Sequence, residues 1–455
     1  MTTLTPTQER DIRYQLHPYT NAVKHEQIGP RIIDRGEGIY VYDDQGRQYI
    51  EAMAGLWSVA VGFNEQRLID AASAQMAKLP FYHTFTHKAH TPSIALAEKL
   101  VQLTDGAMDA AFFTNSGSEA NDTVIKMVWY YNNALGRKDK KKIIARNRGY
   151  HGVTVASASL TGLAPNHRDF DLPLPRMKHT TCPHFYREGK PGETEADFAN
   201  RMADELEALI LREGPETVAA FIGEPVMGAG GVIVPPDTYW DKIQAVCRKH
   251  DILIVADEVI TGFGRLGTMF GAQRFNIKPD IMVLSKQITS SYMPLAAVLI
   301  NKPVHEVISR HSGELGTFGH GYTASGHPVA TAVALENIRI IEERGLVENA
   351  ARIGQVLQSS LRAFVDHPLV GEVRGTGLIA AVELVADKAA RTPFDPVGKA
   401  GAAIYEAAHN HGLIVRGIQD SIAFCPPLII NEEQVRDVVR RFGNVLEDVG
   451  PTLKA

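Results

Sequence analysis

The sequence is poor in cysteine: Cys182, Cys247 and Cys425 are far apart and form no CxxC pair. This scarcity excludes a disulfide framework or a zinc ribbon and is typical of a protein in a reducing cytoplasm. The sequence also lacks any apolar run long enough to span a bilayer, and its polar N-terminus has no apolar signal core. We therefore expect a cytoplasmic protein without a membrane partner.

The chain has no excess of positive charge. Its 47 basic and 52 acidic residues give a net charge of −5, which argues against a nucleic-acid partner. Metal motifs are missing as well. His83 and His87 share helical spacing, but no carboxylate lies between them as HExxH requires, so we predict no metal site.

What the sequence does contain is a long alternation of strand and helix patterns. From residue 110 onward, short apolar runs alternate with helical periodicity, which favours a mostly parallel sheet with crossover helices. With 455 residues, the chain is too long for one core. We expect an α/β large domain with a seven-stranded sheet over 66–328. A smaller α+β domain would combine 329–455 with 1–65, where 1–35 form an extended arm and 38–49 a hairpin.

Five predicted strands end in unusual residues. The groups are Asn115-Ser116-Gly117-Ser118, Tyr150-His151-Gly152, Glu224, Asp257 and Lys286. Because the carboxyl ends of parallel strands share one edge of a sheet, these groups would converge on one crevice.

Each group also has an ordinary interpretation. Ser116 or Ser118 could be a simple helix N-cap, Asp257 could pair with Arg265, and Lys286 could be a common strand-end lysine. Together they favour pyridoxal phosphate, which needs an anion cradle, an amine for the Schiff base, a carboxylate at the ring nitrogen and an aromatic over the ring. The carboxylate keeps that nitrogen protonated, since a nearby anion favours the charged form.

Several motifs resemble the class III (omega) aminotransferases of pyridoxal-phosphate fold type I. They are NSGSEAND, RGYHG, GEPV, ADEVITGFGR, the Ser285-Lys286 pair and GYTASGHP, and the resemblance extends over about 19–432. It is closest to the amine–pyruvate aminotransferases. The resemblance implies that Lys286 is the Schiff-base lysine, that Asp257 is the pyridinium partner and that Val259 packs opposite Tyr150. It also implies phosphate contacts from Gly117, Ser118 and the partner subunit's Thr323, hence a homodimer or a dimer of dimers.

The same resemblance implies a substrate pocket. Trp57 and Phe85 would line the amine side with Tyr19 nearby, and Arg416 would pair with the carboxylate of the acceptor. The alternatives are plain core packing for the aromatics and a surface position for Arg416. Glu224 could tune the site or pair with a neighbouring cation. The chain departs from many family members after the lysine, where it has Gln287 and Ser290-Ser291 instead of glycines.

The predicted reaction is transfer of an amino group from a primary amine or omega-amino acid to a keto acid such as pyruvate. The donor stays open between β-alanine, taurine, a diamine and an arylalkylamine. Three rivals remain: a nicotinamide enzyme, because 262–267 matches GxGxxG; decarboxylation or intramolecular amino migration on the same cofactor; and a non-catalytic binding protein. The glycines of 262–267 come late after the strand, and no long helix is predicted to open on them.

Overall fold

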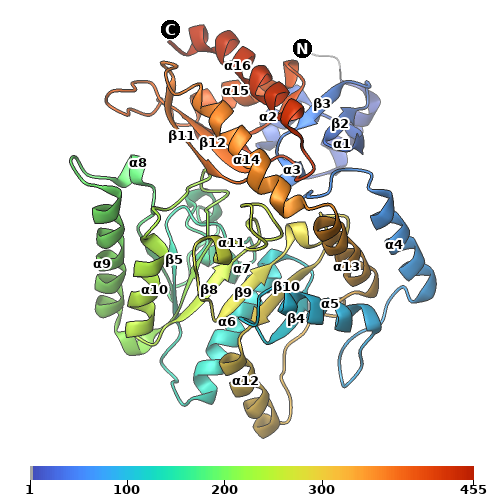
Figure 1. Cartoon of the computed structure of the whole chain (residues 1–455), viewed down its shortest axis with the longest axis vertical. Helices are drawn as coiled ribbons and strands as arrows, with labels where there is room; N and C mark the ends of the chain where they lie inside the picture. Colours follow the sequence, from blue (N-terminus) through green and yellow to red (C-terminus); the bar gives the residue numbers. More distant parts are fainter. Residues whose placement is uncertain (1–3, 455) are drawn as a thin grey trace.

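A seven-stranded sheet forms the centre of the large domain in the computed structural model, which describes residues 4–454 (Figure 1). Its order is β4(Ala110–Thr114), β10(Ala296–Ile300), β9(Ile281–Leu284), β8(Leu253–Asp257), β7(Val218–Gly223), β5(Lys142–Arg146), β6(Met177–Thr180). β10 is antiparallel to both neighbours, whereas the other six strands run the same way. The predicted sheet is therefore confirmed, with β6 as a strand that the sequence pattern had not indicated.

Both faces of this sheet are covered, which is why its strands are almost continuously apolar. β7 is buried at every position. Phe221 packs into one core cluster with Phe198 and Trp240, while Ile222 on the opposite face joins Val124 in another. The helices between residues 66 and 343 are α4(Gln66–Lys78), α5(Thr91–Gln102), α6(Gly117–Ala134), α7(Val155–Leu160), α8(Phe185–Glu188), α9(Glu195–Glu213), α10(Tyr239–Lys249), α11(Gly271–Arg274), α12(Lys302–Leu315) and α13(Pro328–Glu343).

Two four-stranded sheets lie at the other end of the molecule, near both termini (Figure 1). One combines β1(Ile33–Glu37), β2(Tyr40–Asp43), β3(Gln48–Glu51) and β13(Leu413–Ile414); the other combines β11(Val370–Thr376), β12(Ile379–Leu384), β15(Ser421–Phe424) and β14(Arg416–Ile418). Helices α14(Leu346–Arg362), α15(Lys399–Asn410) and α16(Glu432–Lys454) pack there. Because β13 pairs in parallel with β3, the N- and C-terminal parts of the chain share one sheet.

The N-terminal arm differs from the extended segment that the sequence predicted. It contains two short helices, α1(Pro6–Tyr14) and α2(Ala22–Ile28). Local capping explains them: Thr5 and Gln8 form a capping box around Pro6, and the Asn21 side chain accepts a hydrogen bond from Lys24 N. These polar caps form without an apolar stripe, so apolar periodicity could not reveal the helices.

Three elements in the remaining chain depend on local turns and caps. β11 and β12 are joined by a turn at Gly377 with φ +55°. β13 and β14 are short neighbouring strands that pair in different sheets. Asn301 caps α12, which continues to Leu315.

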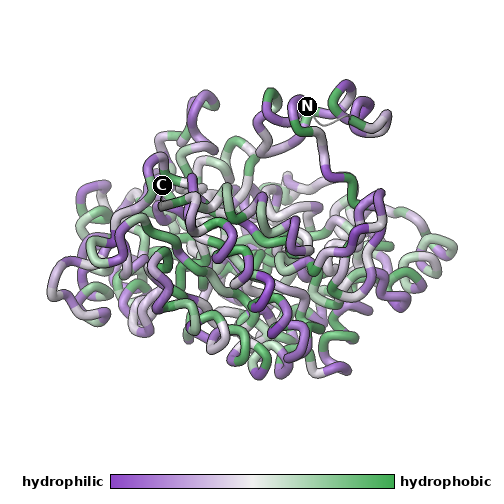
Figure 2. The backbone as a smooth tube through the Cα atoms, turned by 90° about the horizontal axis from the view of Figure 1, so that it is seen from above, coloured by the Kyte–Doolittle hydropathy of each residue, from purple (hydrophilic) through white to green (hydrophobic). Residues whose placement is uncertain are grey.

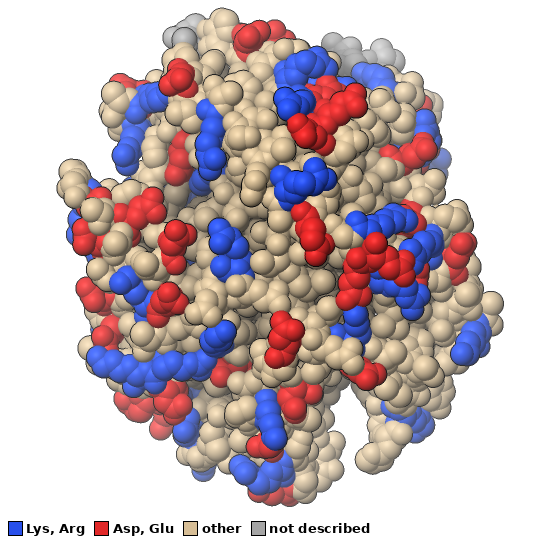
Figure 3. Space-filling view, in the orientation of Figure 1, with Lys and Arg blue, Asp and Glu red and all other residues tan. Residues whose placement is uncertain are grey.

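The surface carries no single dominant charge on the side seen in Figure 3, where acidic and basic side chains are interspersed. Figure 2 shows that the stretch near the N-terminus projects from the body of the molecule. Over residues 4–454, no helix combines the length and apolarity that crossing a membrane requires.

Candidate active site

The predicted strand ends meet in one cavity. Lys286 follows β9 and Asp257 ends β8, which is the neighbouring strand. The cavity has a volume of about 530 Å³, part of which is open to solvent, and is lined by Gly117, Ser118, Asn121, Tyr150, His151, Gly152, Glu224, Asp257, Val259, Ile260, Ser285 and Lys286. All five groups singled out in the sequence thus contribute to the same cavity, as parallel strands require.

Asp257 is buried and held by three donors. Its Oδ2 accepts hydrogen bonds from His151 Nδ1 at 2.7 Å and from Asn121 Nδ2 at 3.0 Å, and its Oδ1 accepts one from Val259 N at 3.2 Å. His151 and Asn121 were not assigned roles from the sequence, although both lie in motifs that drew attention, RGYHG and NSGSEAND. They fix the carboxylate in one orientation toward the cavity.

The alternative partner for Asp257, Arg265, is engaged elsewhere. Its guanidinium donates to the carbonyl oxygens of Leu378 and Pro426 and to Gln287 Oε1. Asp257 is therefore not one half of an ordinary salt bridge with Arg265.

Lys286 has an unusual ammonium group. Burial lowers its pKa to about 8, and the negative charges of Asp257 and Glu224 oppose that shift only in part. A fraction of the amine is therefore unprotonated near neutral pH, which makes it a nucleophile and a proton acceptor. The backbone of Lys286 lies at φ +47°, a conformation that costs a non-glycine residue about 1–3 kcal/mol and that marks many functional sites.

Glu224 supports the backbone around the cavity. Its carboxylate accepts hydrogen bonds from Tyr150 N at 3.0 Å and Gly228 N at 2.9 Å, and burial raises its pKa. Arg146 donates to the backbone oxygen of Glu224 at 2.5 Å and makes no hydrogen bond to its carboxylate. Glu224 therefore fixes the segment that carries Tyr150.

The start of α6 has the features of an anion cradle. Ser116 is the N-cap, with its side chain accepting from Glu119 N, as its ordinary interpretation predicted. Gly117 and Ser118 nevertheless line the cavity. The backbone packs closely here, since a Cβ placed on Gly152 would lie 2.6 Å from Ser118 Oγ. A helix N-terminus with small residues favours an anionic group such as a phosphate.

Tyr150, Tyr19 and Arg416 come together beside the cavity. Burial and the nearby Tyr19 hydroxyl hold the pKa of Tyr150 above its ordinary value, and the Arg416 charge partly opposes this. Tyr19 comes from the N-terminal arm, where its hydroxyl accepts from Asn166 Nδ2 at 2.6 Å. Burial lowers the pKa of the Arg416 guanidinium, and within residues 4–454 that group has no ion-pair or hydrogen-bond partner. Arg416 is thus a half-buried cation without a counter-ion rather than a surface arginine.

Five predicted site residues do not line the cavity of their own chain: Tyr19 and Arg416 lie beside it, and the other three are Trp57, Phe85 and Thr323. Trp57 is buried in an apolar cluster that also contains Cys425 and Ile260, and Ile260 lines the cavity. Phe85 is 43% exposed, and Thr323 lies on an exposed loop. Phe85 lies against the loop that carries Thr323, because a Cβ placed on Gly321 of that loop would lie 2.8 Å from the Phe85 ring.

The unusual residues after the lysine have defined structural tasks. Gln287 is fully buried, where it donates to the carbonyl oxygens of Ile260 and Gly262 and accepts from Arg265. Ser290 and Ser291 both have positive φ, +49° and +59°, the conformation that glycine adopts at least cost. Ser290 Oγ also accepts from Ala60 N at 3.1 Å, so its side chain is used structurally.

The glycines of 262–267 do not form a dinucleotide-binding turn. The helix that follows, α11, begins only at Gly271 and has four residues. Gly262 O accepts a hydrogen bond from Gln287, and Gly264 N donates to Met269 O. A loop folded on itself in this way lacks the long helix that would hold a pyrophosphate.

Comparison with known families supports the interpretation of the cavity. The family Aminotransferase class-III matches residues 20–446. The chain belongs to the class III aminotransferases. Its cofactor is accordingly pyridoxal 5′-phosphate, and the residues of the cavity fit that group: an amine, a buried carboxylate, a helix N-terminus and a flat aromatic side chain.

Relatives of known structure and name agree with this assignment. An omega transaminase from Pseudomonas jessenii in complex with PMP is 64% identical with a TM-score of 0.98, and the match covers 99% of each chain. A solved transaminase with L-ala is 61% identical with a TM-score of 0.92, covering 93% of this chain and 100% of that one. Gamma aminobutyrate transaminase 3 of Solanum lycopersicum is 52% identical over 95% of this chain and 84% of its own length.

Proposed function

We propose that this class III aminotransferase moves the amino group of a primary amine or an omega-amino acid to a keto acid such as pyruvate. The observation that carries the proposal is the presence of two basic side chains with different surroundings. Lys286 lies inside the cavity, and Arg416 lies beside Tyr150 without a counter-ion. Two relatives support the substrates, since one solved transaminase holds L-ala and another relative is named for gamma-aminobutyrate.

Lys286 is the residue proposed to bind the cofactor covalently through Nζ and then to move a proton at the reacting carbon. Pyridoxal phosphate, when bound, supplies the electron sink that makes this carbon acidic. A lysine with a pKa of about 8 suits the proton transfer, because a general base works best when its pKa lies near the working pH.

Asp257 is proposed to keep the pyridine nitrogen of the cofactor protonated. His151 and Asn121 hold its Oδ2, so the carboxylate is fixed before the cofactor arrives. Gly117 and Ser118 would bind the phosphate at the start of α6, and Tyr150 and Val259 would flank the ring from opposite faces.

Arg416 is proposed to bind the carboxylate of the keto acid. An arginine that is partly removed from water and lacks a counter-ion gains most from a planar anion, which its guanidinium binds in a bidentate manner. Trp57 and Tyr19 would limit the space on the amine side of the pocket. Trp57 belongs to the apolar cluster that contains the cavity residue Ile260, and Tyr19 comes from the N-terminal arm.

The active form is proposed to be a homodimer or a dimer of dimers. Thr323 and Phe85 are exposed and do not line the cavity of their own chain, and Phe85 lies against Gly321 of the loop that carries Thr323. A partner that supplies Thr323 to the phosphate would bring Phe85 to the same pocket. Light scattering at micromolar concentration tests this assembly, and a monomer with full activity would contradict it.

The reaction is tested with a panel of amines and pyruvate, following alanine by chromatography. The panel contains β-alanine, taurine, γ-aminobutyrate, a diamine and an arylalkylamine. Alanine formation in proportion to amine consumed supports amino transfer, whereas release of carbon dioxide or migration of the amino group within one substrate supports the rival reactions. Borohydride reduction followed by peptide mass analysis should find the cofactor on Lys286. An unmodified Lys286 would overturn the assignment.

A further inference from the structure

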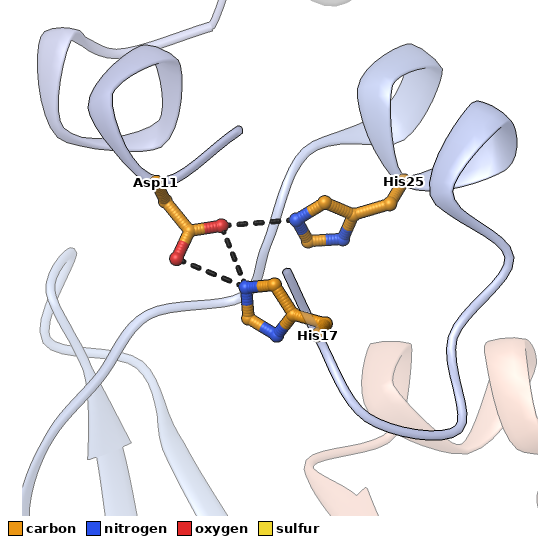
Figure 4. A group of neighbouring side chains, drawn as sticks. All are labelled: Asp11, His17 and His25. Atoms are coloured by element: carbon orange, nitrogen blue, oxygen red, sulfur yellow. Dashed lines mark hydrogen bonds and ion pairs between the residues drawn. The ribbon is translucent and has the colours of Figure 1, made fainter. Parts of the chain in front are cut away.

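The N-terminal arm contains a cluster of three side chains outside the cavity described above. Asp11 lies on α1, His25 on α2, and His17 on the loop between them, and all three point toward one another (Figure 4). Asp11 Oδ2 is 2.9 Å from His17 Nε2 and 2.9 Å from His25 Nε2, and the two imidazole centroids are 4.3 Å apart. Two imidazole nitrogens therefore converge on one carboxylate.

The spacing of these atoms is close to that of a metal site. The three ligand atoms all lie within 4.8 Å of one another. Around a tetrahedral zinc ion with bonds of about 2.0–2.1 Å, neighbouring ligand atoms are about 3.3 Å apart. Small side-chain rotations that open the Asp11–histidine distances by about 0.4 Å would thus admit an ion.

A second cluster with similar residue types shows what a closed arrangement is like. His184, Glu372 and Glu383 also converge, but Arg374 Nη1 lies 2.7 Å from Glu372 and 2.5 Å from Glu383. That guanidinium already occupies the place of a cation. In the arm, by contrast, the two histidines are the side-chain partners of the Asp11 carboxylate within residues 4–454.

The arm cluster is also accessible. Its side chains are 12–26% exposed, and His17 and His25 line an open cavity of about 670 Å³ together with Glu26 and Thr20. An ion can therefore enter from solvent, and a water molecule can complete its coordination. Three protein ligands and one exchangeable ligand make a four-coordinate site.

We propose that Asp11, His17 and His25 form a binding site for a divalent transition metal of the zinc class. Imidazole and carboxylate donors favour Zn²⁺, Ni²⁺ or Cu²⁺ over Mg²⁺ or Ca²⁺, which prefer oxygen ligands. The metal would bind Nε2 of each imidazole, which leaves the ring hydrogen on Nδ1.

The metal would fasten the segment between the two histidines. That segment carries Tyr19, whose hydroxyl accepts from Asn166 and which lies beside Tyr150 at the cavity. Closing the loop of residues 17–25 through an ion reduces the freedom of the arm and holds Tyr19 in place. The site thus links a metal ion to the outer wall of the cavity.

Metal binding is tested on the chelator-treated holoenzyme, titrated with Co²⁺ and followed by visible absorption at wavelengths beyond the cofactor band. The wild type should bind one Co²⁺ per chain, and Zn²⁺ should displace it. The double variant His17→Ala, His25→Ala should bind about 10-fold more weakly or worse. His305→Ala is the matched control, because His305 forms a similar exposed pair with Asp109 at 2.6 Å outside the arm.

The control and a second variant keep this test decisive. His305→Ala should titrate like the wild type, and Asp11→Asn should bind weakly while retaining its cofactor colour and circular dichroism. Equal Co²⁺ affinity in the wild type and the double variant would overturn the proposed site. None of these readouts depends on which amine the enzyme uses.

The effect on the arm is tested by proteolysis. Lys24 is exposed and lies inside the 17–25 segment, so trypsin can cut there. Zn²⁺ should slow cleavage after Lys24 in the wild type and leave the rate unchanged in the double variant, which also controls for inhibition of trypsin itself. Equal cleavage of the wild type with and without Zn²⁺ would overturn the fastening of the arm.

Discussion

The two sides of the cavity are built differently. On the cofactor side, Lys286, Asp257 and Glu224 lie at the ends of strands of one buried sheet, and hydrogen bonds fix the carboxylates of Asp257 and Glu224. On the proposed substrate side, Tyr19 comes from a loop of the N-terminal arm and is 68% exposed. The proposed chemistry is therefore held by the sheet, whereas the proposed choice of substrate depends on an exposed segment that can change in sequence without unfolding the core.

The strongest test of the cofactor side is Lys286→Ala. Loss of the proton-transferring amine should lower kcat by about 10²–10⁴-fold or more, while the phosphate cradle still retains part of the cofactor. Alanine formation from pyruvate and cofactor content after dialysis measure the two effects.

The matched control is Lys178→Ala. Lys178 lies on β6, is partly exposed and forms an ion pair with Glu213. It should leave turnover unchanged. Substantial residual turnover in Lys286→Ala would contradict the proposed role of Lys286 in binding the cofactor and transferring the proton.

Asp257→Asn tests the same side with less change of shape. The amide keeps the size of the side chain but loses the charge that favours a protonated ring nitrogen, so kcat should fall by about 100-fold or more. Absorption spectra should also change, because ring protonation alters the cofactor band. If kcat stays within a few-fold of the wild type, Asp257 has a structural task only.

Arg416→Leu tests the substrate side. Removing a charged hydrogen-bond donor should raise KM for pyruvate by about 10–100-fold, which corresponds to about 1.5–3 kcal/mol. KM for an amine without a carboxylate should stay near its wild-type value. Equal increases for both substrates would mean that Arg416 stabilises the pocket and does not select the acceptor.

The pH dependence of cofactor uptake tests the cofactor side alone, because it reports the protonation of Lys286. Burial lowers the pKa of Lys286 to about 8, and only the neutral amine attacks the aldehyde of the cofactor. The uptake rate of the apoenzyme should therefore rise about 10-fold per pH unit below 8 and level off above it. Stopped-flow absorption measures this rate. A midpoint near the ordinary lysine value would contradict the burial of Lys286.

The smallest effect is expected for Tyr19→Phe. Its hydroxyl accepts one hydrogen bond from Asn166 at an exposed position, so the loss should cost about 0.5–1.5 kcal/mol and change KM for the amine by roughly 2–10-fold. Steady-state kinetics with a small and a bulky amine measure it, and Tyr14→Phe, on an exposed ring elsewhere in the arm, is the control. A loss as large as that of Asp257→Asn would remove the contrast between the two sides.

Much of the cofactor side could be predicted from the sequence. Apolar runs that stop at Asp257 and Lys286 indicated strand ends, and parallel strands leave only one edge where those ends meet. His151 and Asn121 were missed as partners of Asp257, because their distances of 2.7 and 3.0 Å depend on how α6 and the loop after β5 pack. Periodicity reports which face of an element is apolar and says nothing about such pairings.

The sequence by itself determined the alternation of strands and helices in the large sheet apart from β6, the residues at the strand ends and the family. These follow from local patterns and motifs, which persist wherever the segments end up. Only the tertiary structure decided that Arg265 is engaged by Gln287, that Phe85 and Thr323 lie outside their own cavity, and that two helices of the arm bring Asp11, His17 and His25 together. Contacts of this kind depend on the relative placement of distant segments, which is fixed by packing of the whole core.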